Sequence, residues 1–148
     1  MPGIQELSSV IKNAAHAQSS AAGNAEAFLA SAHSNSLYVH DCSYLPDAVK
    51  AKSSDTLSST DDQHFACATI SLFHIGAASQ LHPILIVLDY KGDMENSVVV
   101  FNKRVTLIAS GASEKAKPLE QEKNDWLWRY AKTCAQVSDW IRHESLYV

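Results

Sequence analysis

The histidines are the residues of this chain that most invite a search for metal chemistry, because imidazole is a common metal ligand. No two of them are three or four residues apart, the spacing that places two side chains on one face of a helix. The seven are His16, His33, His40, His64, His74, His82 and His143. Two short stretches combine ligand types, His40-Asp41-Cys42 and Asp61-Asp62-Gln63-His64. Because neighbouring side chains on a strand point to opposite faces, the first stretch cannot converge on one ion without distortion. We expect both stretches to be exposed polar residues, with a metal site as the alternative.

Motifs for nucleotide binding and for hydrolysis are absent from the sequence. It contains no Gly-rich phosphate loop, no G-x-S-x-G elbow and no H-E-x-x-H. The dipeptide His143-Glu144 begins like the last of these, but Tyr147 occupies the second ligand position. Packing is the expected role of three tryptophans that fall within one predicted helix, and a cofactor platform is the alternative. They are Trp126, Trp128 and Trp140.

The three cysteines, Cys42, Cys67 and Cys134, form no CxxC pair and no metal-finger spacing. An odd number leaves at least one thiol unpaired. We expect the cysteines to be small buried hydrophobic side chains, and they do not determine the redox compartment of the protein.

The composition predicts a chain that buries a core, since 46% of its residues are hydrophobic and 19% charged. The formal net charge of −4 and the absence of a Lys/Arg run argue against nucleic acid as a partner. The N-terminus lacks the uninterrupted apolar stretch of a secretory signal. The longest apolar run, Ile84 to Leu88, is far shorter than the roughly 20 residues that cross a bilayer. We therefore expect no transmembrane segment and, by default, a cytoplasmic location.

The elements that must position these residues begin with weakly apolar helices. Helical spacing of Ile4, Leu7, Val10 and Ile11 predicts a helix to about Gln18. We expect residues 19–23 to weaken or break it, and Asn24 to cap a second helix through Ala30.

Short strands and turns are predicted in the middle of the chain. Apolar or β-branched runs predict strands at residues 37–40, 81–88, 97–101 and 105–108. Residues 65–73 fit either a strand or a buried helix. Residues typical of turns and loops occupy 44–47, 53–62, 76–79 and 91–93, and a short helical turn is expected through Lys52.

A long helix is predicted near the C-terminus. It follows a polar loop at residues 110–123 and can be capped by Asn124 or Asp125. One stripe at helical spacing is expected to be buried: Leu127, Tyr130, Ala131, Cys134, Ser138 and Ile141. The fold class is therefore α+β, with N-terminal helices, short antiparallel strands and a long C-terminal helix. Residues 1–36 form a poorly specified helical segment, and residues 37–148 form the main unit.

The predicted C-terminal helix carries a pattern of its own. Trp126 leads into Ala131-Lys132, and Asp139 and His143 follow. The stretch Trp126 to Glu144 resembles the helix that delivers the first metal ligand in lipoxygenases, and it is most similar to the fungal branch. Residue types and spacing agree over about 19 residues, which is much longer than a chance motif. Upstream segments also resemble the fungal branch and follow one another in the same order as in the family. They are residues 37–41, 81–86, 89–96 and 101–104.

This resemblance covers about Leu37 to Glu144 and implies part of the catalytic domain of an iron or manganese linoleate lipoxygenase, a domain that is mainly α-helical in the family. It implies a dioxygenase that adds O₂ to a polyunsaturated fatty acid and gives a hydroperoxide. His143 matches the first histidine ligand of the metal, for which imidazole is a suitable donor. Asp139, one turn earlier on the same helix face, is a candidate for holding the helix or the ligand in place, with a structural or solvated carboxylate as the alternative.

The sequence departs from the family after Glu144. The family has a second histidine five residues after the first, where this chain has Val148. We therefore expect a truncated, inactive fragment. Alone, it should bind no iron or manganese and form no hydroperoxide. The alternatives are a non-catalytic interaction module or a degenerate gene product. Self-association through an exposed terminal helix is a further expectation, because that helix loses the neighbours that cover it in the family.

Overall fold

A computed structural model describes residues 15–48, 69–76, 79–88, 90, 92, 97–105 and 123–146. Its elements are α2 (Ser19–Ser31), the 3₁₀ turn η1 (Ser34–Ser36), β1 (Leu37–Asp41), α3 (Leu45–Ala48), β2 (Ile70–Ile75), β3 (Leu81–Leu88), β4 (Val98–Phe101) and α6 (Trp126–Leu146). The four strands form one antiparallel sheet in the order β1-β2-β3-β4. The α+β class predicted from the sequence is confirmed.

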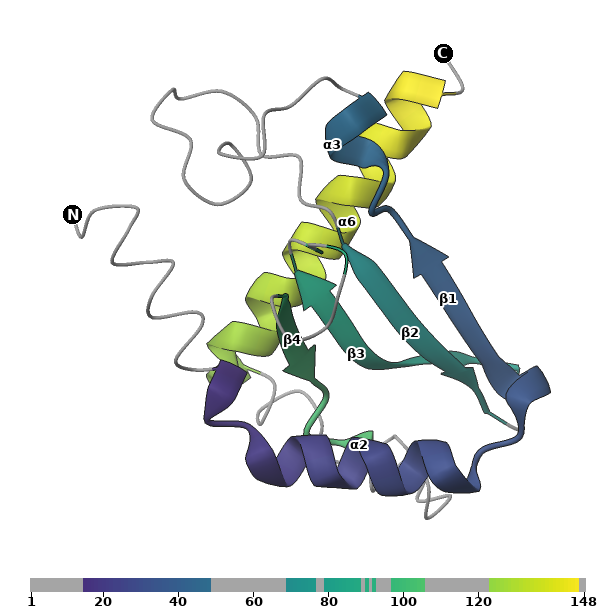
Figure 1. Ribbon diagram of the computed structural model, residues 1–148, viewed down its shortest axis with the longest axis vertical. Coiled ribbons are helices and arrows are strands. Elements are labelled where there is room, and N and C mark those ends of the chain that lie inside the picture. Colours follow the sequence, from purple (N-terminus) through teal and green to yellow (C-terminus); the bar gives the residue numbers. More distant parts are fainter. Residues whose placement is uncertain are drawn as a thin grey trace.

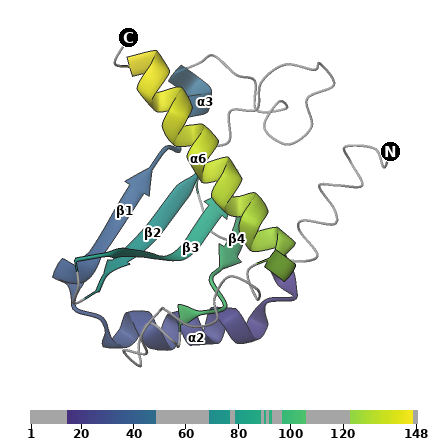
Figure 2. The same cartoon turned by 180° about the vertical axis from the view of Figure 1, so that it is seen from behind.

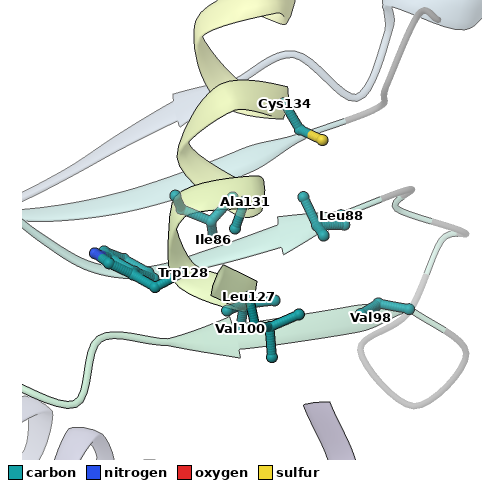
Figure 3. Packing of buried hydrophobic residues seen from close by; sticks show 8 residues of the cluster. All are labelled: Ile86, Leu88, Val98, Val100, Leu127, Trp128, Ala131 and Cys134. Carbon is teal, nitrogen blue, oxygen red and sulfur yellow. The ribbon is translucent and has the colours of Figure 1, made fainter. Parts of the chain in front are cut away.

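Helix α6 crosses one face of the sheet and forms the larger core with it (Figures 1 and 2). Figure 3 shows the helix side chains directed at the strands below them. The buried members of this core are Ile86, Leu88, Val98, Val100, Leu127, Trp128, Ala131 and Cys134. Burying a Val, Leu or Ile side chain is worth about 1.5–3 kcal/mol, so this contact is a main source of stability.

Helix α2 lies along the end of the sheet where β1 begins and β4 ends (Figure 1). Its residues Ala25 and Phe28 join Ile84 and Val105 in a second core. Gln18, just before the helix, is buried, and its Oε1 accepts the N–H of Phe101 at 2.9 Å. The start of α2 therefore satisfies a backbone donor of the edge strand β4.

A bulge in β3 changes which side chains face each helix. Leu72 of β2 is opposite Leu85, whereas Phe73 is opposite Pro83, so Ile84 is an extra residue in β3. Ile84 is fully buried in the α2 core, and Ile86 packs under α6. The extra residue lets one strand contribute to both cores.

Asp125 fixes the start of α6. Its Oδ1 accepts the N–H of Trp128 at 3.2 Å, which confirms Asp125 as a helix cap. Its Oδ2 lies 3.2 Å from Nζ of Lys103, in the turn after β4. The carboxylate thus joins the N-terminal end of the helix to the edge of the sheet that it covers.

Several expectations about elements need correction or cannot be compared. The expected break at residues 19–23 is wrong, because α2 runs through them and the chain turns at Ala17 and Gln18 instead. Packing of Ala21 and Ala25 on one side outweighs the weak propensity of Gly23. Val105 lies outside the sheet, and its N–H bonds back to the carbonyl of Asn102. The strand alternative for residues 65–73 is right from Ile70 onward.

Other expectations fall on residues that the structure does not describe. These are the first helix before residue 15, the loops at 53–62 and 110–122, and the run at 106–108. None of the described helices combines the length and apolar character needed to cross a membrane.

Candidate functional site

Helix α6 carries both residues that the sequence singled out. Asp139 and His143 are exposed in its C-terminal half. Asp139 Oδ1 lies 3.4 Å from Nε2 of His40 on β1, and 69% of the Asp139 side chain is accessible to solvent. The carboxylate therefore contacts the sheet while it remains largely exposed to water.

His40 is the centre of a small polar cluster, which we call the His40 cluster: His40, Cys42, Asp139 and Arg142. Nη1 of Arg142 lies 2.9 Å from Nε2 of His40. Because guanidinium is only a donor, Nε2 accepts this bond in the neutral imidazole. In the protonated imidazole the same nitrogen is a donor, and Asp139 is then its acceptor. The cluster thus offers His40 a partner in either protonation state.

Cys42 lies on the same side of the chain as His40. Its Sγ is 3.7 Å from Nε2 and 3.9 Å from Nδ1 of His40. Burial raises the pKa of the Cys42 thiol, and the positive charge of Arg142 opposes this shift only in part. A buried thiol with a raised pKa is mostly protonated near neutral pH, so Cys42 contributes packing here and not a reactive thiolate.

Asp41 points away from the His40 cluster, as the alternation of a strand predicts. Its Oδ1 accepts the backbone N–H of Ser43 at 2.8 Å. Hydrogen bonds from Ser43, first through its side chain and then through its backbone, lower the pKa of the Asp41 carboxyl. The stretch His40-Asp41-Cys42 therefore divides between two faces, as strand alternation predicts. The expectation that the whole stretch is exposed is wrong for Cys42, which is buried.

The described part of the chain does not fit a metal ion by itself. It contains no group of three or more His, Cys, Asp or Glu side chains placed to hold one. His143 has the right donor chemistry but is a single imidazole on an exposed helix face. The second stretch with ligand types, residues 61–64, lies outside the described residues.

An open groove of about 400 Å³ lies beside the His40 cluster, between α6 and the strands β1, β2 and β3. Aromatic and aliphatic side chains form most of it, and His40, Gln136 and Asp139 give it a polar side. Its lining is Tyr38, Val39, His40, Ser71, Phe73, Leu81, Ala135, Gln136 and Asp139. The hydroxyl of Ser71 is buried and has no hydrogen-bond partner among the described residues.

Sequence reasoning missed this groove and the role of Arg142. A partial signal was present, because Tyr38 and His40 alternate along β1 and must share a face. The partners of that face could not be deduced, since Phe73 and Leu81 join it only through strand pairing, and Arg142 is 102 residues from His40.

Comparison with known proteins gives a consistent result. The chain is 39% identical over 122 residues to a manganese lipoxygenase of Pleurotus sapidus, and the match covers 81% of this chain and 18% of that protein. No profile of a known protein family matches the chain.

The structure is similar to part of a fungal lipoxygenase from Fusarium graminearum. In one crystal form of that enzyme the TM-score is 0.64 at 32% identity, covering 90% of this chain and 22% of the enzyme. In another crystal form the TM-score is 0.55 at 34% identity, and the match covers 74% of this chain and 17% of the enzyme. The chain thus spans about a fifth of the length of these relatives. Over this segment it is a relative of the fungal lipoxygenases, which confirms the resemblance read from α6.

Proposed function

We propose that this chain forms part of a lipoxygenase-type oxygenase that adds O₂ to a polyunsaturated fatty acid such as linoleate and yields a hydroperoxide. The observation that carries the proposal is the 39% identity to a manganese lipoxygenase, together with likeness of fold to a fungal lipoxygenase. The pattern from Trp126 to His143 lies on the ordered helix α6, which supports the same assignment.

Within this proposal, His143 is one ligand of an iron or manganese ion, and the other donors come from outside the described residues. The metal supplies the redox chemistry with O₂ when it is bound. What this chain supplies is placement of the ligand. Arg142 and Asp139 lie three residues apart on α6, and both contact His40 of β1. These two contacts hold the part of α6 that carries His143 against the sheet.

The first experiment asks what the 148-residue chain does alone. The purified chain is incubated with iron(II) or manganese(II), dialysed and analysed for bound metal, and then assayed with linoleate for conjugated-diene absorbance. We expect no stoichiometric metal and no diene formation, because a single imidazole binds such ions weakly. Bound metal in a one-to-one ratio together with diene formation would show that the chain alone is an active enzyme.

The second experiment tests the role of His143 inside a complete enzyme. The matching segment of the Pleurotus sapidus manganese lipoxygenase is replaced by this chain's segment, and His143→Gln is compared with His33→Gln. His33 is exposed and lies on the turn after α2. We expect the chimera to lose metal and at least about a hundredfold in activity with His143→Gln, and neither with His33→Gln. Full metal content in the His143 variant contradicts the ligand assignment.

A non-catalytic interaction module is the second candidate function, and the open groove beside α6 favours it. Tyr38, Val39 and Leu81 line this groove and remain 47%, 64% and 56% exposed. Exposed apolar side chains gathered at one groove are typical of surfaces that bind another polypeptide.

A further inference from the structure

The outer edge of β1 is open within the described part of the chain. β1 is the outermost strand on one side of the sheet in both views (Figures 1 and 2). The N–H of Cys42 donates to the carbonyl of Thr69 at 2.9 Å, directly beyond the pair Asp41 and Ile70. Hydrogen-bonding direction alternates along an antiparallel strand. Tyr38 and His40 therefore bond to β2, and the backbone groups of Leu37, Val39 and Asp41 point outward.

At the opposite edge of the sheet, formed by β4, a side chain satisfies an outward backbone group. At β4 the side chain of Gln18 accepts the N–H of Phe101. β1 has no proline, no lysine and no bulge, which are three of the features that protect an edge. Its pairing with β2 is regular from Leu37 to Asp41, and Val39 is 64% exposed.

We propose that β1 pairs with β1 of a second copy of this chain, antiparallel and about a two-fold axis at Val39. In this register Val39 is opposite its own counterpart, Leu37 is opposite Asp41 of the second copy, and Tyr38 is opposite His40 of the second copy. All outward backbone groups of the strand then find partners of the correct kind. This inference concerns association only, and it is independent of the proposed catalytic role.

The sequence of β1 favours a second copy over an unrelated strand. The five residues are self-complementary in this register: the only carboxylate of the strand is opposite leucine, so no like charges meet. An axis perpendicular to the sheet keeps the α6 faces of both copies on the same side. Tyr38 of each copy then lies across from the His40 cluster of the other, and the two grooves become continuous.

A cysteine at the axis tests the register directly. Directly opposite residues of a hydrogen-bonded pair have Cα atoms about 5.5 Å apart, within the range of a disulfide. We expect Val39→Cys to form a covalent dimer on mild oxidation. The matched control Asp41→Cys is also exposed, but its two copies lie four residues apart along the strands, about 13 Å, and do not react. The unsubstituted chain, with Cys42 and Cys134 buried, gives the background.

A second pair of variants separates edge pairing from other modes of association. Val39→Pro removes only an outward N–H and leaves the bonds to β2 in place, whereas Val39→Thr keeps that N–H in a side chain of similar size. In sedimentation velocity we expect the unsubstituted chain and Val39→Thr to be dimers and Val39→Pro to be a monomer with unchanged far-UV circular dichroism.

Three results would overturn the proposal. The first is a monomer at every concentration for the unsubstituted chain. The second is a dimer that survives Val39→Pro or crosslinks equally through Asp41→Cys, which places the contact on another surface such as α6. The third is a Val39→Cys adduct whose mass shows a different polypeptide, because the edge then belongs to a foreign strand.

Discussion

At the scale of single residues, the surroundings of His74 alter its pKa. Its ring lies edge-on to Phe28 with centroids 5.0 Å apart, and its Nδ1 is buried without a hydrogen-bond partner in the part of the chain that the structure describes. Burial lowers the pKa of His74 below its ordinary value, and the charge of His82, the residue opposite it on β3, lowers it further. The folded state therefore favours neutral His74.

The lowered pKa of His74 sets the sign of a pH effect on the stability of the fold. Between the lowered folded pKa and the ordinary value of about 6.5, the unfolded chain binds the proton more strongly, so stability falls as pH decreases. We expect His74→Phe, which keeps an aromatic ring against Phe28, to reduce the loss of stability between about pH 7 and pH 5. The measurement is urea unfolding across that range, and the exposed His33→Phe is the control. An unchanged pH slope in His74→Phe contradicts the assignment.

Residue types were easier to interpret from the sequence than their partners were. Burial of Cys42 and Cys134 was predicted and is confirmed, and Cys67 lies outside the described residues. The divergence of His40 and Asp41 follows from strand geometry alone. The contacts of His40 with Asp139 and Arg142 do not, because they depend on how a helix docks on a strand about a hundred residues away in sequence.

At the scale of elements, α6 shows what helical periodicity predicts and what it omits. The predicted stripe is buried at Leu127, Ala131, Cys134 and Ser138. Trp128 is outside that stripe yet only 2% exposed, because the sheet is wide enough to contact a broader face of the helix. The three tryptophans therefore differ, since Trp126 and Trp140 remain 47% and 64% exposed.

This difference predicts unequal effects of the same substitution. Trp128→Ala removes a buried ring from the core under α6 and is expected to cost about 3–5 kcal/mol of unfolding free energy. Trp140→Ala, on the exposed face of the same helix, is expected to change it by less than about 0.5 kcal/mol. Urea unfolding followed by far-UV circular dichroism measures both without depending on tryptophan fluorescence. Equal losses would place α6 differently from the docking described here.

At the scale of the whole molecule, the two edges of the sheet are unlike each other. Gln18 covers a donor of β4, while the outer edge of β1 has no partner among the described residues. The sequence identified the strands that form these edges, but their order depends on pairing that no local pattern encodes. The expectation of self-association through the terminal helix stays a prediction, and much of the apolar stripe of that helix is already buried on the sheet.

Pairing through β1 links stability to concentration. If the folded chain dimerises and the unfolded chain does not, mass action raises the unfolding midpoint with chain concentration. We expect a rise of roughly 2 °C for each tenfold increase, and none for Val39→Pro. Differential scanning calorimetry over a hundredfold range of concentration measures this, and a midpoint independent of concentration for the unsubstituted chain would contradict dimerisation.

The position of α6 at the end of the described chain also has a consequence for biosynthesis. The strands that it covers are complete at Phe101, but the helix residues that bury them begin at Leu127. At about 5–20 residues per second, the ribosome needs roughly one to five seconds to make the intervening segment. During that interval Ile86, Leu88, Val98 and Val100 lack the helix that buries them, and transiently exposed apolar surface of this kind is what chaperones protect.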